Sequence, residues 1–274
     1  MAGCAVHISD LHRGANELLE VDDALVELVA RIGPTLVIAT GDLANRGRAE
    51  ELARARALLD RLAVPWLAVP GNHDLPYTLP ARVTAPGRTF GRVIGPTEPV
   101  FVDAEIAVQG LDSSWAWRHQ GGRLRASSLD RAAATLAAAP PGALRVVALH
   151  HHLAGAPWRA TRKLPLRSRD RVLERFRAMG VDLVLGGHIH QSTAVGLSDI
   201  ANDDGRPGRR LALATAPGFG RPRPHHLGEA HGVNVVEWTS EAISVITLSW
   251  DVSSGEAGTF LPAARRLFCR ANLP

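Results

Sequence analysis

The sequence predicts an α/β fold in which helices cover a layered sheet. Short apolar runs rich in β-branched residues alternate with stretches in which apolar residues recur at helical spacing. Beyond Gly187 the apolar runs follow one another without helices, which indicates strands that pair as an antiparallel meander. No internal repeat or low-complexity linker interrupts the pattern. We therefore expect one domain over residues 1–252, followed by a tail over 253–274 that is exposed or forms a short helix.

The expected elements follow in chain order. The first unit consists of a strand at 4–8, a helix at 17–31, a strand at 36–39, a helix at 48–62 and a strand at 65–69. Short apolar segments at 99–102 and 106–111 precede a helix at 127–139, which Ser127 or Ser128 can cap. The remaining elements are a strand at 144–149, a helix at 169–179, and strands at 182–185, 211–214, 233–237 and 243–250.

Composition narrows the class of protein. Hydrophobic residues make up 46% of the 274 positions, which is ordinary for a soluble globular protein. No apolar run approaches the roughly 20 residues of a membrane-spanning helix. The N-terminal segment lacks the features of a secretory signal, so we expect a cytoplasmic protein with no transmembrane segment.

Cysteine usage and charge exclude further classes. Cys4 and Cys269 are too few for a disulfide framework or a thiolate metal cluster. The formal net charge is +4, and the arginines that supply it are scattered among acidic residues. We therefore expect no obligatory nucleic-acid partner. The sequence leaves the oligomeric state open.

Polar residues of metal-ligand type follow five of the predicted strands. The carboxyl ends of strands in open α/β sheets line the crevice where ligands bind, so these clusters can converge on one site. Oxygen and imidazole donors without thiolates suit manganese, iron, zinc or cobalt ions. The five clusters are Ser9 to His12, Gly41-Asp42, Gly71 to Asp74, His150 to His152, and Gly187 to His190.

The spacing inside two of these clusters suggests paired donors. In Asp10-Leu11-His12 and His188-Ile189-His190 one apolar residue separates the two donors, so in an extended segment both side chains project to the same side. The glycines of the clusters allow sharp turns and a close approach of the backbone to an ion or phosphate. These are Gly41, Gly71, Gly186 and Gly187.

The ordered motifs D-x-H, G-D, G-N-H-D, H and G-H-x-H resemble those of the calcineurin-like metallophosphoesterase superfamily. HISDLH, PGNHD, LHHHL and the chain length are most similar to bacterial class III cyclic-nucleotide phosphodiesterase-like enzymes. The resemblance implies an α/β/β/α sandwich of two mixed sheets flanked by helices. It also implies hydrolysis of a phosphodiester, such as a 3',5'-cyclic nucleotide, or of a small phosphomonoester by a metal-bridging hydroxide.

The resemblance further implies two divalent or mixed-valence metal ions. Asp10, His12 and His190 are expected to bind one ion, Asn72, His150 and His188 the other, and Asp42 both. His150 directly follows a predicted strand, and His151 is both the alternative ligand and a candidate substrate contact. Many relatives have proline where this chain has His152-Leu153, which leaves the conformation of that loop open.

His73 is the expected general acid. It follows Asn72, and Asp74 can orient its imidazole and favour the protonated form. The alternative is that His73 stabilises transition-state charge without transferring a proton. Arg13 follows His12 and either contacts a phosphate oxygen or points to solvent.

Other residues have both a functional and a structural interpretation. The basic stretch from Arg159 to Arg167, with Trp158, Arg162 and Lys163, either forms a rim over the cleft or is a solvated loop. The segment 115–119 either forms a substrate-binding wall or packs onto the core. His225 and His226 are expected on the surface. His7 should face the sheet core, with one hydrogen bond, as a structural residue.

Three alternative functions remain open. A hydrolase of lipid-linked or nucleotide-sugar phosphodiesters fits the same metal residues, because substrate-selecting loops vary independently of the metal ligands. A nuclease would usually need an extended basic face or a capping domain. A non-catalytic scaffold is expected to have lost ligands or the acid, whereas this sequence keeps the whole set.

Overall fold

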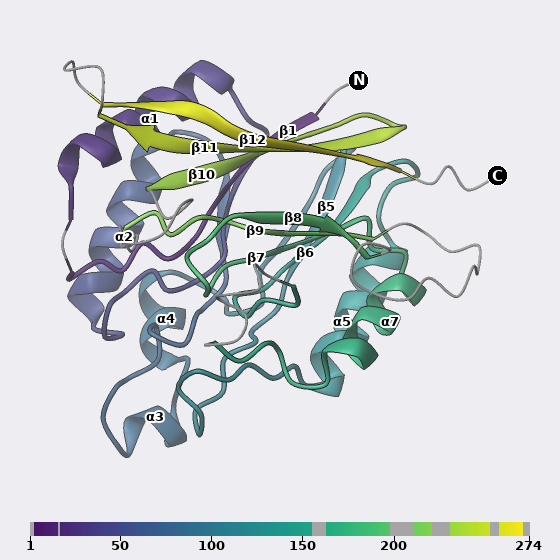
Figure 1. Cartoon of the computed structure of the whole chain (residues 1–274). Helices are drawn as coiled ribbons and strands as arrows, with labels where there is room; N and C mark the ends of the chain where they lie inside the picture. Colours follow the sequence, from purple (N-terminus) through teal and green to yellow (C-terminus); the bar gives the residue numbers. More distant parts are fainter. Residues whose placement is uncertain are drawn as a thin grey trace.

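The computed structural model describes residues 3–15, 17–154, 163–197, 211–220, 231–252 and 258–270, and it confirms the predicted layered fold. Two mixed β-sheets of six strands each stack on one another, with helices on the outer faces (Figure 1). The strands of the first sheet are β1 (Gly3–Ile8), β2 (Leu36–Ala39), β3 (Trp66–Ala68), β10 (Gly232–Trp238), β11 (Ala242–Asp251) and β12 (Thr259–Cys269). Their order is β12-β11-β10-β1-β2-β3.

The second sheet has the order β4-β5-β6-β7-β9-β8, with β5, β6, β7 and β9 mutually parallel. Its strands are β4 (Val100–Val102), β5 (Ile106–Gly110), β6 (Leu144–Ala148), β7 (Leu183–Gly186), β8 (Thr193–Gly196) and β9 (Ala212–Thr215). The helices are α1 (Leu19–Ile32), α2 (Ala49–Arg61), α3 (Ala81–Thr84), α4 (Arg88–Val93), α5 (Ala126–Ala137) and α7 (Arg169–Ala178).

Three apolar clusters fill the spaces between the four layers. A strand contributes to two clusters because its alternate residues face opposite sides of the sheet. In β1, Val6 belongs to the cluster under α1 and α2, whereas Ala5 belongs to the cluster between the sheets. Val147 of β6 and Phe176 of α7 belong to the third cluster, which lies under α5 and α7. Burial of each such Val, Ile, Leu or Phe side chain contributes about 1.5 to 3 kcal/mol.

The C-terminal region differs from the expectation. Residues 259–269 form β12, an edge strand antiparallel to β11, so the predicted tail includes a strand of the first sheet. Most of its side chains are exposed, and it contains Pro262, which an edge strand tolerates. The meander consists of β10, β11 and β12, while β9 pairs in parallel with β7 in the other sheet.

The predicted serine cap of α5 is wrong. The N-cap position is Arg125, without a side-chain cap bond, and Ser127 and Ser128 lie in the first turn. The short helices α3 and α4 and strand β8 were not predicted. Among the described residues, no helix combines the length and apolar character that crossing a membrane requires.

Candidate metal centre

The structure brings all seven predicted metal ligands to one site. Six of them follow the carboxyl ends of the parallel pair β1 and β2 in the first sheet and of the parallel pair β6 and β7 in the second. The seventh, Asn72, lies in the loop after β3. Backbone hydrogen bonds join the loops, including Asp10 N to Gly41 O at 2.9 Å and Gly187 N to His150 O at 2.9 Å. All seven side chains are buried. The donors are therefore held by two sheets rather than by one mobile loop.

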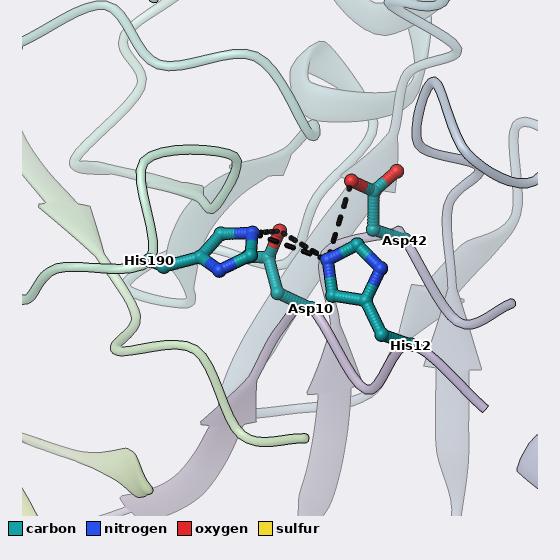
Figure 2. A group of neighbouring side chains, drawn as sticks. All are labelled: Asp10, His12, Asp42 and His190. Carbon is teal, nitrogen blue, oxygen red and sulfur yellow. Dashed lines mark hydrogen bonds and ion pairs between the residues drawn. The ribbon is translucent and has the colours of Figure 1, made fainter. Parts of the chain in front are cut away.

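The first group consists of Asp10, His12, Asp42 and His190, whose side chains point toward a common centre (Figure 2). His190 Nε2 lies 3.1 Å from Asp10 Oδ1 and 3.1 Å from His12 Nε2. His12 Nε2 lies 3.8 Å from Asp42 Oδ2. These spacings place four donor atoms around a space the size of one ion.

The second group consists of Asp42, His150 and His188. His150 Nε2 lies 3.3 Å from Asp42 Oδ2, 3.2 Å from Asn72 Oδ1 and 3.2 Å from His188 Nδ1. His150 Nδ1 donates to Thr40 O at 2.7 Å, which fixes the ring with Nε2 toward the other donors. Asp42 belongs to both groups, as a bridging ligand must.

The donor set fits divalent ions. Bonds of about 2.0 to 2.2 Å place neighbouring ligand atoms about 2.8 to 3.1 Å apart in octahedral geometry and about 3.3 to 3.6 Å apart in tetrahedral geometry. Asp10 Oδ1 and Asp42 Oδ2 are buried and accept no hydrogen bond among the described residues, and the nearest basic groups are the imidazoles of His190 and His150 at 3.1 and 3.3 Å. Buried carboxylate oxygens without partners are costly unless a cation compensates them. Two ions sharing Asp42 would do so.

The electrostatics of the two groups keep the carboxylates ionised. Burial opposes ionisation of Asp42, but His150 and His73 outweigh it and hold the pKa of the Asp42 carboxyl well below its usual value. Burial would lower the pKa of His150, but the Asp42 carboxylate outweighs it and raises that pKa to about 9. Burial, followed by the charge of His190, lowers the pKa of His12 to about 3.

The backbone at the ligands corrects the expectation of extended pairs. Asp10, His12, Asp42, His188 and His190 all have φ between 47° and 73°, in the left-handed region. Such conformations are uncommon for non-glycine residues and cluster at functional sites. The donors of each D-x-H and H-x-H pair therefore converge through two left-handed residues, not through the alternation of a strand.

Two glycines permit the close approach of these loops. Gly41 has a φ of 90°, and a Cβ there would lie 2.6 Å from Gly71 N. A Cβ on Gly187 would lie 1.8 Å from Ser9 Oγ and 2.7 Å from Asp10 Oδ2. Side chains at either position would push the loops apart.

His73 lies at the edge of the centre and is half-buried. Its ring centroid is 4.8 Å from that of His12, and its backbone N–H donates to Asp42 Oδ1 at 2.8 Å. Its Nδ1 lies 2.8 Å from Asn45 O and 2.7 Å from Tyr77 Oη. The tyrosine contact was not predicted, because Tyr77 carried no motif signal.

The predicted orientation of His73 by Asp74 is not observed. The Asp74 carboxylate is buried and accepts hydrogen bonds from Ala44 N and Gly71 N, both at 2.8 Å. It therefore joins the loops after β2 and β3. Its pKa is raised to about 7 by burial and by the nearby Asp42 charge.

Arg13 has a different partner from the predicted phosphate. It is 2% exposed, and its guanidinium donates to both Asp22 carboxylate oxygens at 2.6 and 2.9 Å. This bidentate pair ties the loop after β1 to helix α1. The structure therefore favours a structural role, since the guanidinium is already engaged inside the protein.

His151 is fully buried behind His150. Its Nδ1 lies 2.9 Å from Ser113 Oγ, and its ring centroid is 4.7 Å from that of His188. It contacts the donor cluster but belongs to neither group of candidate ligands. The geometry therefore favours His150 as the ligand. Buried His152 stacks on His188, with ring centroids 5.8 Å apart.

A pocket of about 410 Å³ lies beside His151, because Gly122 of its lining packs against that imidazole: a Cβ on Gly122 would lie 2.3 Å from His151 Cγ. Trp115 lines it, and the guanidinium carbons of Arg118 and Arg167 lie 5.5 and 5.6 Å from its ring centroid. Trp117 is 72% exposed, so the segment 115–119 does not simply pack onto the core. The other lining residues are Gly121, Gly122, Leu164, Pro165 and Leu166.

The structure describes two further residues that the sequence analysis singled out, Lys163 and His7. Lys163 donates to His188 O, so part of the basic stretch touches the site. His7 lies buried between the sheets, with Nε2 2.9 Å from Thr40 Oγ1, which confirms its structural interpretation. Five residues named above lie outside the described residues: Trp158, Arg159, Arg162, His225 and His226.

Comparison with known proteins yields sequence relatives. A family model described as calcineurin-like phosphoesterase matches residues 5–192. A probable cyclic nucleotide phosphodiesterase of Rhodococcus erythropolis is 28% identical over 285 residues, covering 96% of this chain and 89% of the relative. A cAMP/cGMP dual specificity phosphodiesterase of Mycobacterium tuberculosis is 28% identical over 202 residues, covering 69% and 62%.

Solved structures share the fold at low identity. A purple acid phosphatase from yellow lupin seeds superposes with a TM-score of 0.69 at 12% identity, covering 98% of this chain and 54% of that protein. A dimetal phosphatase from Danio rerio gives 0.62 at 15% identity, covering 95% and 98%. Together with the family match and the buried donor groups, these findings identify the chain as a metal-dependent phosphoesterase that belongs to the calcineurin-like phosphoesterase family.

Proposed function

We propose that this chain hydrolyses a phosphodiester, with a 3',5'-cyclic nucleotide as the first substrate to test. The observation that carries the proposal is the pair of buried donor groups joined by Asp42. When bound, two ions would supply Lewis acidity and lower the pKa of a water so that it can attack phosphorus. The two relatives named as cyclic nucleotide phosphodiesterases support the substrate class.

In this proposal Asp10, His12 and His190 hold one ion, and Asn72, His150 and His188 the other, with Asp42 shared. The buried ligands are fixed before substrate arrives, so little reorganisation is needed during the reaction. Manganese and iron are the first ions to test, because a mixed oxygen and imidazole set accepts several divalent ions. We also propose that the protein acts in the cytoplasm.

His73 is the proposed general acid. Asn45 O can only accept a hydrogen bond, so Nδ1 of His73 carries a proton and Nε2 is the atom that exchanges one. Donation from Nε2 to the departing oxygen would complete cleavage of the ester bond. The pocket beside His151 suits a nucleotide, because Trp115 and the two guanidinium groups that lie over its ring together offer stacking surfaces to a base.

Metal content and turnover of the purified protein test the proposal. We expect about two transition ions per chain and hydrolysis of bis-p-nitrophenyl phosphate that a chelator abolishes and manganese or iron restores. Cyclic AMP, UDP-linked sugars and glycerophosphodiesters then separate the substrate classes. Absence of metal and of turnover on every diester after reloading would overturn the proposal.

A matched pair of variants tests the pocket. Trp115→Ala should raise KM for cyclic AMP about 10-fold through lost stacking, while leaving kcat for bis-p-nitrophenyl phosphate within about 3-fold. Trp117→Ala, in the same loop but exposed to solvent, is the control and should change neither constant. Equal KM for cyclic AMP in wild type and Trp115→Ala would show that the base binds elsewhere.

A further inference from the structure

A chain of polar contacts leads from His73 to the loop at 112–119. Tyr77 Oη lies 2.7 Å from His73 Nδ1 and 3.2 Å from His119 Nε2. The Nη2 atom of Arg82, in α3, lies 3.3 Å from His119 Nδ1, and the Nε–H of Arg82 donates to Ala116 O at 2.9 Å. Residues that are far apart in sequence thus meet at the proposed acid.

The chemistry of the partners sets the direction of these hydrogen bonds. The carbonyl of Asn45 only accepts, so the proton on His73 Nδ1 faces Asn45 O and Tyr77 Oη together. The guanidinium of Arg82 only donates, so His119 Nδ1 accepts and Nε2 carries the ring proton toward Tyr77. Tyr77 Oη therefore accepts from both imidazoles, and its own O–H bond points away from them.

The three rings also pack on one another. The centroids of His73 and His119 are 4.9 Å apart, those of Tyr77 and His119 5.0 Å, and those of His73 and Tyr77 5.7 Å. Tyr77 is 44% exposed, so this cluster forms the outer wall beside the buried ligands. Burial lowers the pKa of His119 to about 4, consistent with a neutral ring that keeps one acceptor and one donor.

We propose that Tyr77 is a positioning residue for His73, held in place by His119 and Arg82. The Tyr77 hydroxyl and Asn45 O both accept a hydrogen bond from the Nδ1–H of His73. These contacts restrict rotation of the imidazole and keep its Nε2 directed toward the leaving group. The inference rests on the proposed function, because His73 is a positioning target only if it is the acid.

Leaving-group dependence tests the proposal. Diphenyl phosphate and bis-p-nitrophenyl phosphate have similar shape and charge but differ in their leaving groups. Diphenyl phosphate releases phenoxide, the anion of a phenol with a pKa of about 10, and this leaving group depends strongly on receiving a proton. Tyr77→Phe should lower kcat for diphenyl phosphate about 10-fold and kcat for bis-p-nitrophenyl phosphate less than about 3-fold, with metal content and KM unchanged. The double variant His73→Ala, Tyr77→Phe should lose no more kcat for diphenyl phosphate than His73→Ala alone, because both residues act on the same step.

The sequence supplies a direct structural readout, since Tyr77 is its only tyrosine. Protein grown with tyrosine labelled at Cζ should give one NMR signal, which moves in His119→Gln and stays in place in Trp117→Phe, an exposed position of the same loop. Equal loss on both diesters, additive losses in the double variant, or an unmoved signal in His119→Gln would overturn the proposal. An inert, metal-free wild type would instead overturn the proposed function.

Discussion

The buried donor groups and the outer wall around His73 are built in opposite ways. The seven proposed ligands sit directly after strands or glycine turns of two sheets, and all are buried. The wall consists of His73, Tyr77 and His119, which are half-buried or exposed and belong to the loops that follow β3 and β5. In the proposed function the sheets therefore hold the groups that support attack on phosphorus, while the loops would meet the leaving group and the rest of the substrate.

This difference has a functional consequence. Substitutions in the buried groups should affect metal binding and hence every substrate, because attack on phosphorus is common to all of them. Substitutions in the wall should affect substrates selectively, according to their leaving groups and apolar parts. Buried residues that only brace the loops should affect stability first. Variants of each kind separate these three behaviours.

The largest effect is expected at Asp42. Asp42→Asn keeps the size of the side chain but removes the charge shared by both donor groups, so both ions should bind weakly. We expect kcat/KM on every diester to fall by about 10³-fold or more, together with metal content measured by elemental analysis. Asp130→Asn, an exposed carboxylate, is the control. Full metal content in an inactive Asp42→Asn would assign Asp42 a role other than bridging.

Arg13 should separate bracing from catalysis. Arg13→Leu leaves the Asp22 carboxylate buried without its cation, which costs about 3 to 5 kcal/mol of unfolding free energy. The double variant Arg13→Leu, Asp22→Leu should recover much of this loss. Urea denaturation measures the change. In folded Arg13→Leu, kcat/KM should stay within about 3-fold of wild type, and a loss of 100-fold would restore the predicted phosphate contact.

Asp74 should behave similarly, with a loss of unfolding free energy of comparable size. Asp74→Ala leaves Ala44 N and Gly71 N without their acceptor, which costs about 1 to 3 kcal/mol for each unsatisfied group. The loss should appear as a lower Tm, with leaving-group dependence unchanged. Asp74→Asn keeps one acceptor and should lose less. A selective loss on diphenyl phosphate would instead support the predicted action of Asp74 on His73.

The same contrast explains which features the sequence could predict. The proposed ligands could be found because strand ends are visible as apolar runs, and the residues after them carry their chemistry in the side chain. The left-handed backbone at Asp10, His12, Asp42, His188 and His190 could not, because tertiary contacts impose it against local preference. The two donors of each D-x-H and H-x-H pair do converge as expected. The expected cause, alternation along an extended strand, was wrong.

The wall around His73 and the contacts of Asp74 were harder to predict from the sequence. Their partners lie far apart in the chain or differ from the neighbour that the sequence suggests. Tyr77 and His119 meet across 42 positions, and neither belongs to a motif. Asp74 follows His73, which suggested a side-chain contact, but the turn directs its carboxylate to backbone N–H groups. Strand β12 was missed because an exposed edge strand with a proline lacks the apolar alternation of a buried one.

The smallest effect tests the polar contact between the sheets. Buried His7 lies with Nε2 2.9 Å from Thr40 Oγ1 and Nδ1 3.4 Å from Asn234 Nδ2, and burial lowers its pKa to about 3. The unfolded chain, with a pKa near 6.5, binds the proton more readily, so this stabilisation is complete above pH 6.5 and declines as the pH falls toward 3. The loss approaches about 1.4 kcal/mol per pH unit.

His7→Gln isolates this term, because glutamine keeps a donor and an acceptor but does not titrate. Unfolding free energies of wild type and variant should be compared by urea denaturation of metal-free protein at pH 7, 6 and 5. Other titrations cancel in the difference. Wild type should lose roughly 2 kcal/mol relative to His7→Gln between pH 7 and 5. A constant difference would mean that His7 takes up its proton without unfolding, and that the space between the sheets admits water.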